Sequence, residues 1–455
     1  MGTFHLLNFG CRASQADGAA LKRQLLDAGF VEVAGAEESQ FAVLNTCTVT
    51  ATADAEVRQI IRRIHRANPR CRILVTGCYA QRAAEEIAQL PGVAWVVGNS
   101  HKHVIAGMLA AGQDLGVRFQ ESGARGQESE VGIQNPESRA TVLVGEITEE
   151  FHFAPVFPDD HTRPTLKVQD GCNARCSFCI IPQVRGRSRS LAPEKVVEQV
   201  RALEQSGYRE VVLSGINLGS YGKDLSQRIT FLALLERILA ETSVARLRLS
   251  SIEVMDIGPQ LIRLVARERR LAQHFHVPLQ SGCDRILRLM NRRYWAAQYA
   301  ERIQAIHEQI PNCGIGADVM VGFPGEANQD HETSLRFIES LPFTYLHVFP
   351  YSARPGTPAA TWSGQCNGRV LRERSQEMRT LIARKHQGFL EAQIGRVLSV
   401  LTLDEAEDDA RVALSTNYLK VALPFSDLAP NTLLDVRVGR VREGILYAYR
   451  ESQDG

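Results

Sequence analysis

Three closely spaced cysteines constrain this chain more than any other feature of its sequence. Cys172, Cys176 and Cys179 lie within eight residues, directly after an apolar run at Thr165–Val168 that predicts a strand. Three thiolates in so tight a loop suit three corners of a cubane iron–sulfur cluster. The fourth iron would then lack a protein ligand and be open to a chelating substrate. The alternative is a zinc site, which needs four ligands and would have to recruit a distant Cys or His.

The composition and the charge of the chain are typical of a soluble globular protein. The 455 residues include ten cysteines, and the length predicts roughly two to four domains. The N-terminus lacks the pattern of a signal peptide, and no run of about 18 apolar residues predicts a membrane span. We therefore expect a reducing, cytoplasmic location, no membrane partner, and cysteines that serve as metal ligands or buried thiols. The formal net charge of +1 means that any contact with RNA must rely on local patches.

The first region, residues 1–112, alternates short strands with helices. This alternation predicts an open parallel sheet with helices on its faces. Strands are expected at Phe4–Asn8, Phe41–Leu44, Arg72–Thr76 and Trp95–Val97, and helices at Ser14–Gly29, Asp54–Ala67 and Arg82–Leu90.

A second group of cysteines follows these predicted strands. Cys11, Cys47 and Cys78 each lie just past the C-terminal end of a strand, which is the edge of a parallel sheet where ligands bind. Each alone is typical of a small buried hydrophobe. Together they predict a second shared cluster. Cys71 opens a predicted strand at the opposite end, so we exclude it from this group.

Residues 113–163 are polar and rich in Gly, Ser, Glu and Pro, which predicts a linker with a short pairing strand at Thr141–Val144. Residues 164–390 then repeat a strand–helix unit six times, which predicts a partial (β/α)6 barrel with its site at the strand C-termini. The six strands are expected at Thr165–Val168, Glu210–Leu213, Arg246–Leu249, His274–Val277, Gly314–Met320 and Leu346–Phe349.

Residues 391–455 are short alternating β-structure and predict a small closed β-barrel. The expected strands are Arg396–Leu401, Leu419–Ala422, Leu434–Val438 and Ile445–Tyr449. The same region contains an acidic run, Asp404–Asp409.

Nearly the whole chain resembles the radical SAM methylthiotransferase family. The C-x3-C-x2-C loop matches the signature of the radical S-adenosylmethionine (SAM) enzymes, and the contexts of the first three cysteines match the family's N-terminal domain. The tail resembles a TRAM domain, an RNA-binding β-barrel. Further matching segments are Ile180–Ser190, Ser214–Gly222, His276–Gly282, Met290–Tyr294, Asp318–Glu326 and Phe349–Thr357.

This resemblance implies two [4Fe-4S] clusters and six catalytic cysteines. One cluster would be held by Cys172, Cys176 and Cys179, with SAM bound at its open iron and cleaved to a 5′-deoxyadenosyl radical. The other would be held by Cys11, Cys47 and Cys78 and would carry the sulfur that is transferred.

The resemblance also implies which residues bind SAM. Phe178 would border the adenine, Ser214 and Gly215 the methionyl group, and Glu253 the ribose, while Gln280 and Arg292 would reach the polar groups of SAM. Each of these residues also has an ordinary structural interpretation as a packing or surface residue. Arg185, Arg187 and Arg189 either grip RNA phosphates or pair with acidic neighbours.

The closest branch acts on N6-threonylcarbamoyladenosine at position 37 of tRNA, methylthiolating C2. Asn45–Thr50 and Gly215–Gly222 favour this branch, although the branch typically has His where this chain has Asn217. The implied partners are the tRNA anticodon loop and an electron donor such as flavodoxin or ferredoxin. The alternatives are isopentenyl-adenosine 37 in tRNA, an aspartate of a ribosomal protein, or a non-catalytic iron–sulfur or zinc protein that binds RNA.

Overall fold

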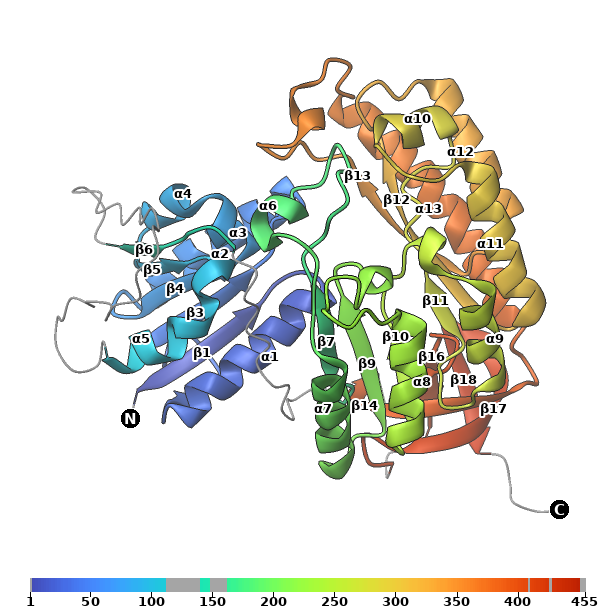
Figure 1. The fold of residues 1–455 in the computed structure, drawn as a ribbon, viewed down its shortest axis with the longest axis horizontal. Helices are drawn as coiled ribbons and strands as arrows, with labels where there is room; N and C mark the ends of the chain where they lie inside the picture. The colour runs from blue at the N-terminus through green and yellow to red at the C-terminus, as the bar shows by residue number, and fades with distance from the viewer. Residues whose placement is uncertain (1, 112–139, 148–161, 408–409, 425–427, 451–455) are drawn as a thin grey trace. The chain divides into compact units, whose positions relative to one another are not determined.

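The computed structural model describes residues 2–111, 140–147, 162–407, 410–424 and 428–450. These residues form two compact units (Figure 1). The first unit contains the described part of Met1–Phe157 with Asp170–Ala174 and Cys179–Arg189, and the second contains the described remainder of the chain. Most of the predicted linker lies outside the described residues. Among the described helices, none has both the length and the apolar character needed to cross a bilayer.

The first unit is a parallel sheet with strand order β2-β1-β3-β4-β5-β6, as the strand–helix alternation predicts. The short strand expected within the linker is present as β6. Strand β2 was not predicted because it has only two residues. The strands are β1 (Thr3–Asn8), β2 (Val31–Glu32), β3 (Phe41–Thr46), β4 (Arg72–Gly77), β5 (Val93–Val97) and β6 (Thr141–Leu143).

Helices α1 and α2 were expected, whereas the helices after β4 differ from expectation and η1 and α5, after β5, were not predicted. One helix was expected at Arg82–Leu90, but two single-turn helices, α3 and α4, stand there and the first begins directly at Cys78. The helical backbone breaks at Ala83, where φ is −138°. The helices are α1 (Arg12–Asp27), α2 (Ala51–Ala67), α3 (Cys78–Arg82), α4 (Ala84–Ala88), η1 (Asn99–Val104) and α5 (Ile105–Ala111).

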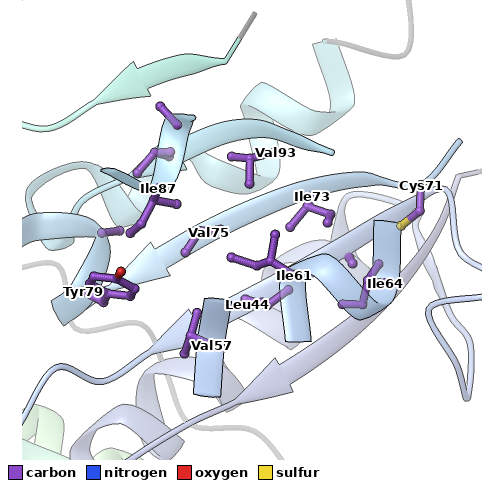
Figure 2. Packing of buried hydrophobic residues seen from close by; sticks show 14 residues of the cluster. Leu44, Val57, Ile61, Ile64, Cys71, Ile73, Val75, Tyr79, Ile87 and Val93 are labelled. Carbon is purple, nitrogen blue, oxygen red and sulfur yellow. The ribbon is translucent and has the colours of Figure 1, made fainter. Parts of the chain in front are cut away.

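Helix α2 aligns the ends of β3 and β4 through a buried stripe. The side chains of Val57, Ile61 and Ile64, at helical spacing, pack on Leu44 and Ile73 in one buried cluster (Figure 2). Each such side chain contributes about 1.5–3 kcal/mol through burial. The helix is also fixed at its start because the side chain of its N-cap residue, Thr50, accepts a hydrogen bond from the Ala53 amide at 3.2 Å.

The second unit contains the predicted partial barrel, and all six expected strands are present. Strands β7, β9 and β10 form one parallel sheet and β11, β12 and β13 another, and parallel bridges Leu247–Leu271 and Ser251–His276 link the two. The strands are β7 (Thr165–Asp170), β8 (Arg189–Ser190), β9 (Glu210–Gly215), β10 (Arg246–Leu249), β11 (His274–His276), β12 (Gly314–Val321) and β13 (Tyr345–Pro350).

Helices alternate with these strands, as a barrel of βα units requires. They are α7 (Pro193–Gln205), η2 (Leu218–Ser220), α8 (Phe231–Glu241), η3 (Val254–Asp256), α9 (Pro259–Arg267), α10 (Asp284–Leu289), α11 (Ala296–Gln309), α12 (Asn328–Ser340), η4 (Pro358–Thr361) and α13 (Gly368–Glu391). The short helix α6 (Ile181–Arg185), which follows β7 in the chain, belongs to the first unit.

The chain ends in a closed β-barrel of strand order β14-β15-β16-β18-β17. Strand β15 was not predicted, and residues 408 and 409, which precede it, lie outside the described residues. The other four strands were expected. The strands are β14 (Val397–Glu407), β15 (Ala410–Ser415), β16 (Lys420–Leu423), β17 (Leu433–Arg442) and β18 (Ile445–Arg450).

Buried ion pairs attach this β-barrel to the bottom of the α/β barrel. Glu210 on β9 accepts hydrogen bonds from Arg248 Nε at 2.7 Å and from Arg246 at 3.5 Å, and all three side chains are buried. Arg248 also donates to the carbonyl oxygens of Ser415 at 2.9 Å and Thr416 at 3.1 Å. Glu210 and Arg246 stand at the N-terminal ends of β9 and β10, whereas the site of a barrel of parallel strands is expected at the C-terminal end.

Candidate functional site

Cys11, Cys47 and Cys78 lie at the carboxyl edge of three neighbouring strands. Cys47 directly follows β3 and Cys78 directly follows β4, while Cys11 is the N-cap residue of α1, just after β1. Strands β1, β3 and β4 are adjacent in the sheet. The loop after β1 and the loop after β3 touch, because a Cβ added to Gly10 would lie 2.3 Å from Cys47 Cβ.

The electrostatics of these thiols show that they are close together. Burial, together with the neighbouring Cys78 and Cys11, raises the pKa of the Cys47 thiol to about 12. Three thiolates at this edge would repel one another, and one neighbouring cation, Arg185, opposes this repulsion only in part. A bound metal centre supplies the positive charge that ionised thiolates need, so this donor set fits a cluster.

Cys71 is excluded from this group, as the sequence indicated. It lies before β4, and Figure 2 shows it at one end of that strand, with Tyr79, the neighbour of Cys78, beyond the other. Its thiol lies 3.5 Å from Ser39 Oγ.

A buried arginine contacts this edge of the sheet. Arg185, the last residue of α6, lies with its Nε 3.3 Å from Cys78 Sγ and donates from Nη1 to both oxygens of Asp170 at 3.0 and 3.1 Å. Its Nη2 donates to Asp17 at 3.1 Å. Burial opposes the charge, but Asp170, Cys78 and Asp17 raise the pKa of Arg185 well above its usual value.

Of the two interpretations that the sequence left open for Arg185, pairing with acidic neighbours is correct. A buried guanidinium paired with two carboxylates is not available to grip RNA phosphates. Arg189 donates to the carbonyl oxygen of Arg185 at 2.8 Å. Arg187 is exposed, so its contact with phosphate stays a prediction.

The segment that follows Cys179 packs on the Cys78 edge. Ile180 and Val184 form one buried cluster with Cys78. Asn99 strengthens this contact, because its Nδ2 donates to the Val184 carbonyl oxygen at 2.7 Å and lies 3.6 Å from Cys78 Sγ. Cys179 is thus one residue away from a side chain that touches a member of the other cysteine group.

Backbone conformation and hydrogen bonds fix the start of the Cys172–Cys179 loop. Gly171 has a φ of +72°, and a Cβ there would lie 1.9 Å from the Arg187 carbonyl oxygen, so only glycine fits. The Cys172 amide donates to the Gly186 carbonyl oxygen at 3.1 Å. The Ala174 amide lies 3.4 Å from Cys172 Sγ, where it would stabilise a thiolate.

Cys176 has a buried ion pair beside it in the second unit. Arg292 Nη1 lies 3.5 Å from Cys176 Sγ, and its Nη2 pairs with Glu253. Burial raises the pKa of Glu253 although Arg292 opposes this shift. The structure therefore brings together two of the residues that the resemblance assigned to SAM, next to a proposed cluster ligand.

Three buried polar atoms at the strand ends have no hydrogen-bond partner among the described residues. They are Asn217 Oδ1, Ser250 Oγ and Gln280 Oε1, which follow β9, β10 and β11 in turn. An unsatisfied buried polar atom costs about 1–3 kcal/mol, so three at one barrel end indicate a polar ligand. Gln280 also has a φ of +68°, a strained conformation typical of ligand sites. This set fits the amino, carboxylate and hydroxyl groups of SAM.

The other residues that were predicted to contact SAM are Phe178, Ser214 and Gly215, and each packs against other parts of the protein. Phe178 packs edge-on against Phe323, with ring centroids 6.4 Å apart. Ser214 is buried in β9. A Cβ on Gly215 would lie 2.9 Å from Gln169 Oε1, so packing against protein already explains the glycine, without a ligand.

A zinc site needs ligand atoms that lie close together. A tetrahedral zinc ion with Zn–S bonds of 2.3 Å holds its sulfur ligands about 3.8 Å apart. Among the described residues, no three cysteine sulfurs lie within 4.8 Å of one another. Within the described ranges, the one group of three His, Cys, Asp or Glu side chains that meets this limit is His276, Asp318 and His347. Sequence reasoning missed this group, although its members lie on three successive predicted strands.

The outer face of the terminal β-barrel carries two cross-strand pairs of arginine and tyrosine. Arg440 on β17 is opposite Tyr447 on β18, with its guanidinium 5.1 Å from the ring centre, and Arg437 is opposite Tyr449. Tyr449 and Arg440 are exposed. Exposed aromatic rings beside arginines are the composition with which β-surfaces stack and hold RNA.

Comparisons with known families cover both cysteine groups. The model of the Radical SAM superfamily matches residues 166–338, and the model of Uncharacterized protein family UPF0004 matches residues 3–98. Among solved structures, the radical S-adenosylmethionine methyltransferase TsrM from Kitasatospora setae has a TM-score of 0.56 at 16% identity, covering 79% of this chain and 75% of that one. This likeness shows the fold.

Curated relatives match along almost the entire chain. The Threonylcarbamoyladenosine tRNA methylthiotransferase MtaB of Aquifex aeolicus (strain VF5) is 36% identical, over 90% of this chain and 94% of the relative. The protein of the same name from Bacillus subtilis (strain 168) is 34% identical, over 99% and 95%. The tRNA-2-methylthio-N(6)-dimethylallyladenosine synthase of Desulforamulus reducens (strain ATCC BAA-1160 / DSM 100696 / MI-1) is 33% identical, over 96% and 93%.

Proposed function

This chain belongs to the radical SAM methylthiotransferase family, and from that premise we propose that it transfers a methylthio group to C2 of N6-threonylcarbamoyladenosine at position 37 of tRNA. The relatives named for threonylcarbamoyladenosine support this substrate, as does the Asn45–Thr50 segment. Relatives named for dimethylallyladenosine are nearly as similar, so isopentenyl-adenosine 37 is the second candidate.

The observation that carries the proposal is the packing around Cys78. Arg185 contacts Cys78 Sγ, and Ile180, next to Cys179, packs on the same cysteine. The segment after the SAM loop and the sulfur-carrying cysteines thus belong to one compact unit. A methylthiotransferase needs its two centres close together, because the radical and the sulfur must reach the same carbon atom.

The residues fit two [4Fe-4S] clusters and SAM. Cys172, Cys176 and Cys179 would hold one cluster, and Cys11, Cys47 and Cys78 the other. When bound, these groups supply a 5′-deoxyadenosyl radical at the first site and transferable sulfur at the second.

The protein's own groups have positioning roles in this proposal. Arg292, paired with Glu253, holds positive charge beside Cys176 Sγ. Gln280 and Ser250 offer buried polar atoms that orient SAM. Arg185 holds positive charge beside Cys78 Sγ.

The proposed partner is the tRNA anticodon loop, because a base in a single-stranded loop can be splayed into a pocket without breaking a duplex. A flavodoxin or ferredoxin would supply electrons, and the cytoplasm is the compartment in which such donors and tRNA meet.

The test is a reaction of the purified, cluster-loaded enzyme with SAM, reductant and two tRNAs, one with threonylcarbamoyladenosine and one with isopentenyl-adenosine at position 37. Mass spectrometry of the nucleosides should show methylthiolation of the threonylcarbamoyl form. Product from the isopentenyl form alone would overturn the substrate but not the reaction. Absence of product from both, from a protein that contains zinc and no iron as isolated and takes up no iron on reconstitution, would favour a non-catalytic RNA-binding protein.

A further inference from the structure

Three side chains of the types that ligate metals, two histidines and an aspartate, meet on one face of neighbouring strands of the α/β barrel. His276 lies on β11, Asp318 on β12 and His347 on β13, and these strands are adjacent and parallel. Asp318 is directly opposite His347, and Gly316, two residues before Asp318, is opposite His276. Because residues two apart on a strand share a face, all three side chains project from the same side of the sheet.

The distances between the side-chain atoms suit hydrogen bonds, and they also match the spacing of ligands around a small metal ion. Asp318 Oδ1 lies 3.2 Å from His276 Nε2 and 3.2 Å from His347 Nδ1, and all three atoms are within 4.8 Å of one another. A four-coordinate ion with bonds of 2.0–2.1 Å to nitrogen and oxygen separates its ligand atoms by about 3.3 Å. An ion could therefore be held with small shifts of the side chains.

A second set of contacts orients the group. Tyr345 Oη lies 3.0 Å from His276 Nδ1, which fixes the imidazole ring and turns its Nε2 toward Asp318. The Tyr345 ring lies across β12 at Gly316, where a Cβ would be only 2.0 Å from the ring, so glycine is required for this arrangement. A hydrogen-bond partner on the other ring nitrogen is what metal-bound histidines in proteins almost always have.

The group is buried on one side and open on the other. His276 is buried, whereas the side chains of Asp318 and His347 are 27% and 62% exposed. An ion can therefore enter from the side of His347. Three protein ligands would leave at least one coordination position for water or for an oxygen group of a ligand.

We propose that His276, Asp318 and His347 bind one divalent transition-metal ion of the Zn²⁺ or Fe²⁺ class, with an open position for an oxygen ligand. Two imidazoles and one carboxylate are the donor set that suits these ions. The site is separate from the six cysteines assigned to iron–sulfur clusters, because none of them belongs to the group. The competing explanation is a hydrogen-bonded triad that binds no ion.

The test uses the full chain with its clusters loaded, so that the six cysteines are occupied, and Zn²⁺ as the probe. Equilibrium dialysis followed by elemental analysis should give about one zinc per chain in addition to the iron. Zinc-edge X-ray absorption should show nitrogen and oxygen neighbours at about 2.0–2.1 Å. Asp318→Asn and His347→Ala should each weaken zinc binding at least tenfold, while His307→Ala, an exposed histidine on α11, should not change it.

His347 is exposed, so its replacement leaves the fold intact and keeps the test decisive. Three results would overturn the site: no zinc beyond the iron, zinc with sulfur neighbours at about 2.3 Å, or equal binding by wild type and both ligand variants. Binding is measured without tRNA or turnover, so the outcome does not depend on the proposed reaction.

Discussion

Arg185 Nε lies 3.3 Å from Cys78 Sγ, and the same guanidinium is locked by Asp170 and Asp17. The two carboxylates are 15 and 168 residues away in the chain, so the arginine fixes three segments of the first unit at once. Its position means that a cluster on Cys11, Cys47 and Cys78 would lie beside a permanent positive charge in a buried environment.

Replacing this arginine should change the second cluster specifically. Arg185→Met removes a charge and a hydrogen bond to a ligand sulfur, both of which favour the more negative, reduced cluster. We expect the reduction potential of that cluster to fall, by an amount on the order of tens of millivolts, in a titration followed by electron paramagnetic resonance. Arg187→Met, at the neighbouring exposed arginine, should leave the potential in place. Equal potentials in Arg185→Met and wild type would contradict the role of Arg185.

Substitutions in the two cysteine groups should abolish different steps of the reaction. Cys47→Ala should reduce the iron content from about eight to about four per chain, keep 5′-deoxyadenosine formation and lose methylthio transfer. Cys176→Ala should lose the other cluster, so the variant should form no 5′-deoxyadenosine from SAM. Cys71→Ala, at the other end of β4, is the control and should keep both reactions. Normal product formation by Cys47→Ala would exclude the sulfur-carrying role.

The buried pair at the base of the α/β barrel should dominate stability at neutral pH. Burial opposes ionisation of Glu210, but Arg248, Arg163 and Arg246 lower its pKa from 4.5 to about 2. Glu210→Gln leaves two buried arginines without their carboxylate, so the free energy of unfolding should fall by about 3–5 kcal/mol.

The pH dependence of this loss has a definite sign. Because the pKa of Glu210 is lowered by folding, its stabilisation is complete above pH 4.5 and disappears as the pH falls through about 2. The stability difference between wild type and Glu210→Gln, measured by denaturant unfolding, should therefore shrink over that range. A difference that grows on acidification would contradict the assignment.

The arginine–tyrosine face of the terminal β-barrel should bind tRNA. Arg440→Ala and Tyr449→Ala should each weaken tRNA binding. For Arg440→Ala, the slope of log affinity against log salt concentration should fall by about one, because one phosphate contact is lost. For Tyr449→Ala, the binding free energy should weaken by about 1–3 kcal/mol, because one base loses its stacking partner. SAM binding should not change, and Arg369→Ala on α13 is a matched exposed control. Point substitutions are preferable to deleting the module, because Arg248 depends on the Ser415 and Thr416 carbonyls. Unchanged tRNA affinity across a salt series would remove the RNA role from this face.

The sequence predicted what depends on local periodicity. All six strands of the α/β barrel and the main strands of the first sheet were expected from apolar runs, and the strand ends placed Cys11, Cys47 and Cys78 on one edge. Strand β15 was not predicted, and the acidic residues Asp404–Glu407 belong to the end of β14. The burial of Arg185 was not predictable, since only carboxylates brought near by folding compensate a buried guanidinium. The proximity of His276, Asp318 and His347 was not predictable either, because it depends on the register in which β11, β12 and β13 pair.

The most direct measurement of the proposed function is mass spectrometry of tRNA nucleosides from cells that lack this protein. The account predicts that 2-methylthio-N6-threonylcarbamoyladenosine disappears and that its precursor without the methylthio group accumulates. Re-expression of the wild type should restore the modified nucleoside, and Cys47→Ala should not. An unchanged amount of 2-methylthio-N6-threonylcarbamoyladenosine in the deleted cells, or loss of the isopentenyl derivative in its place, would contradict the proposed function.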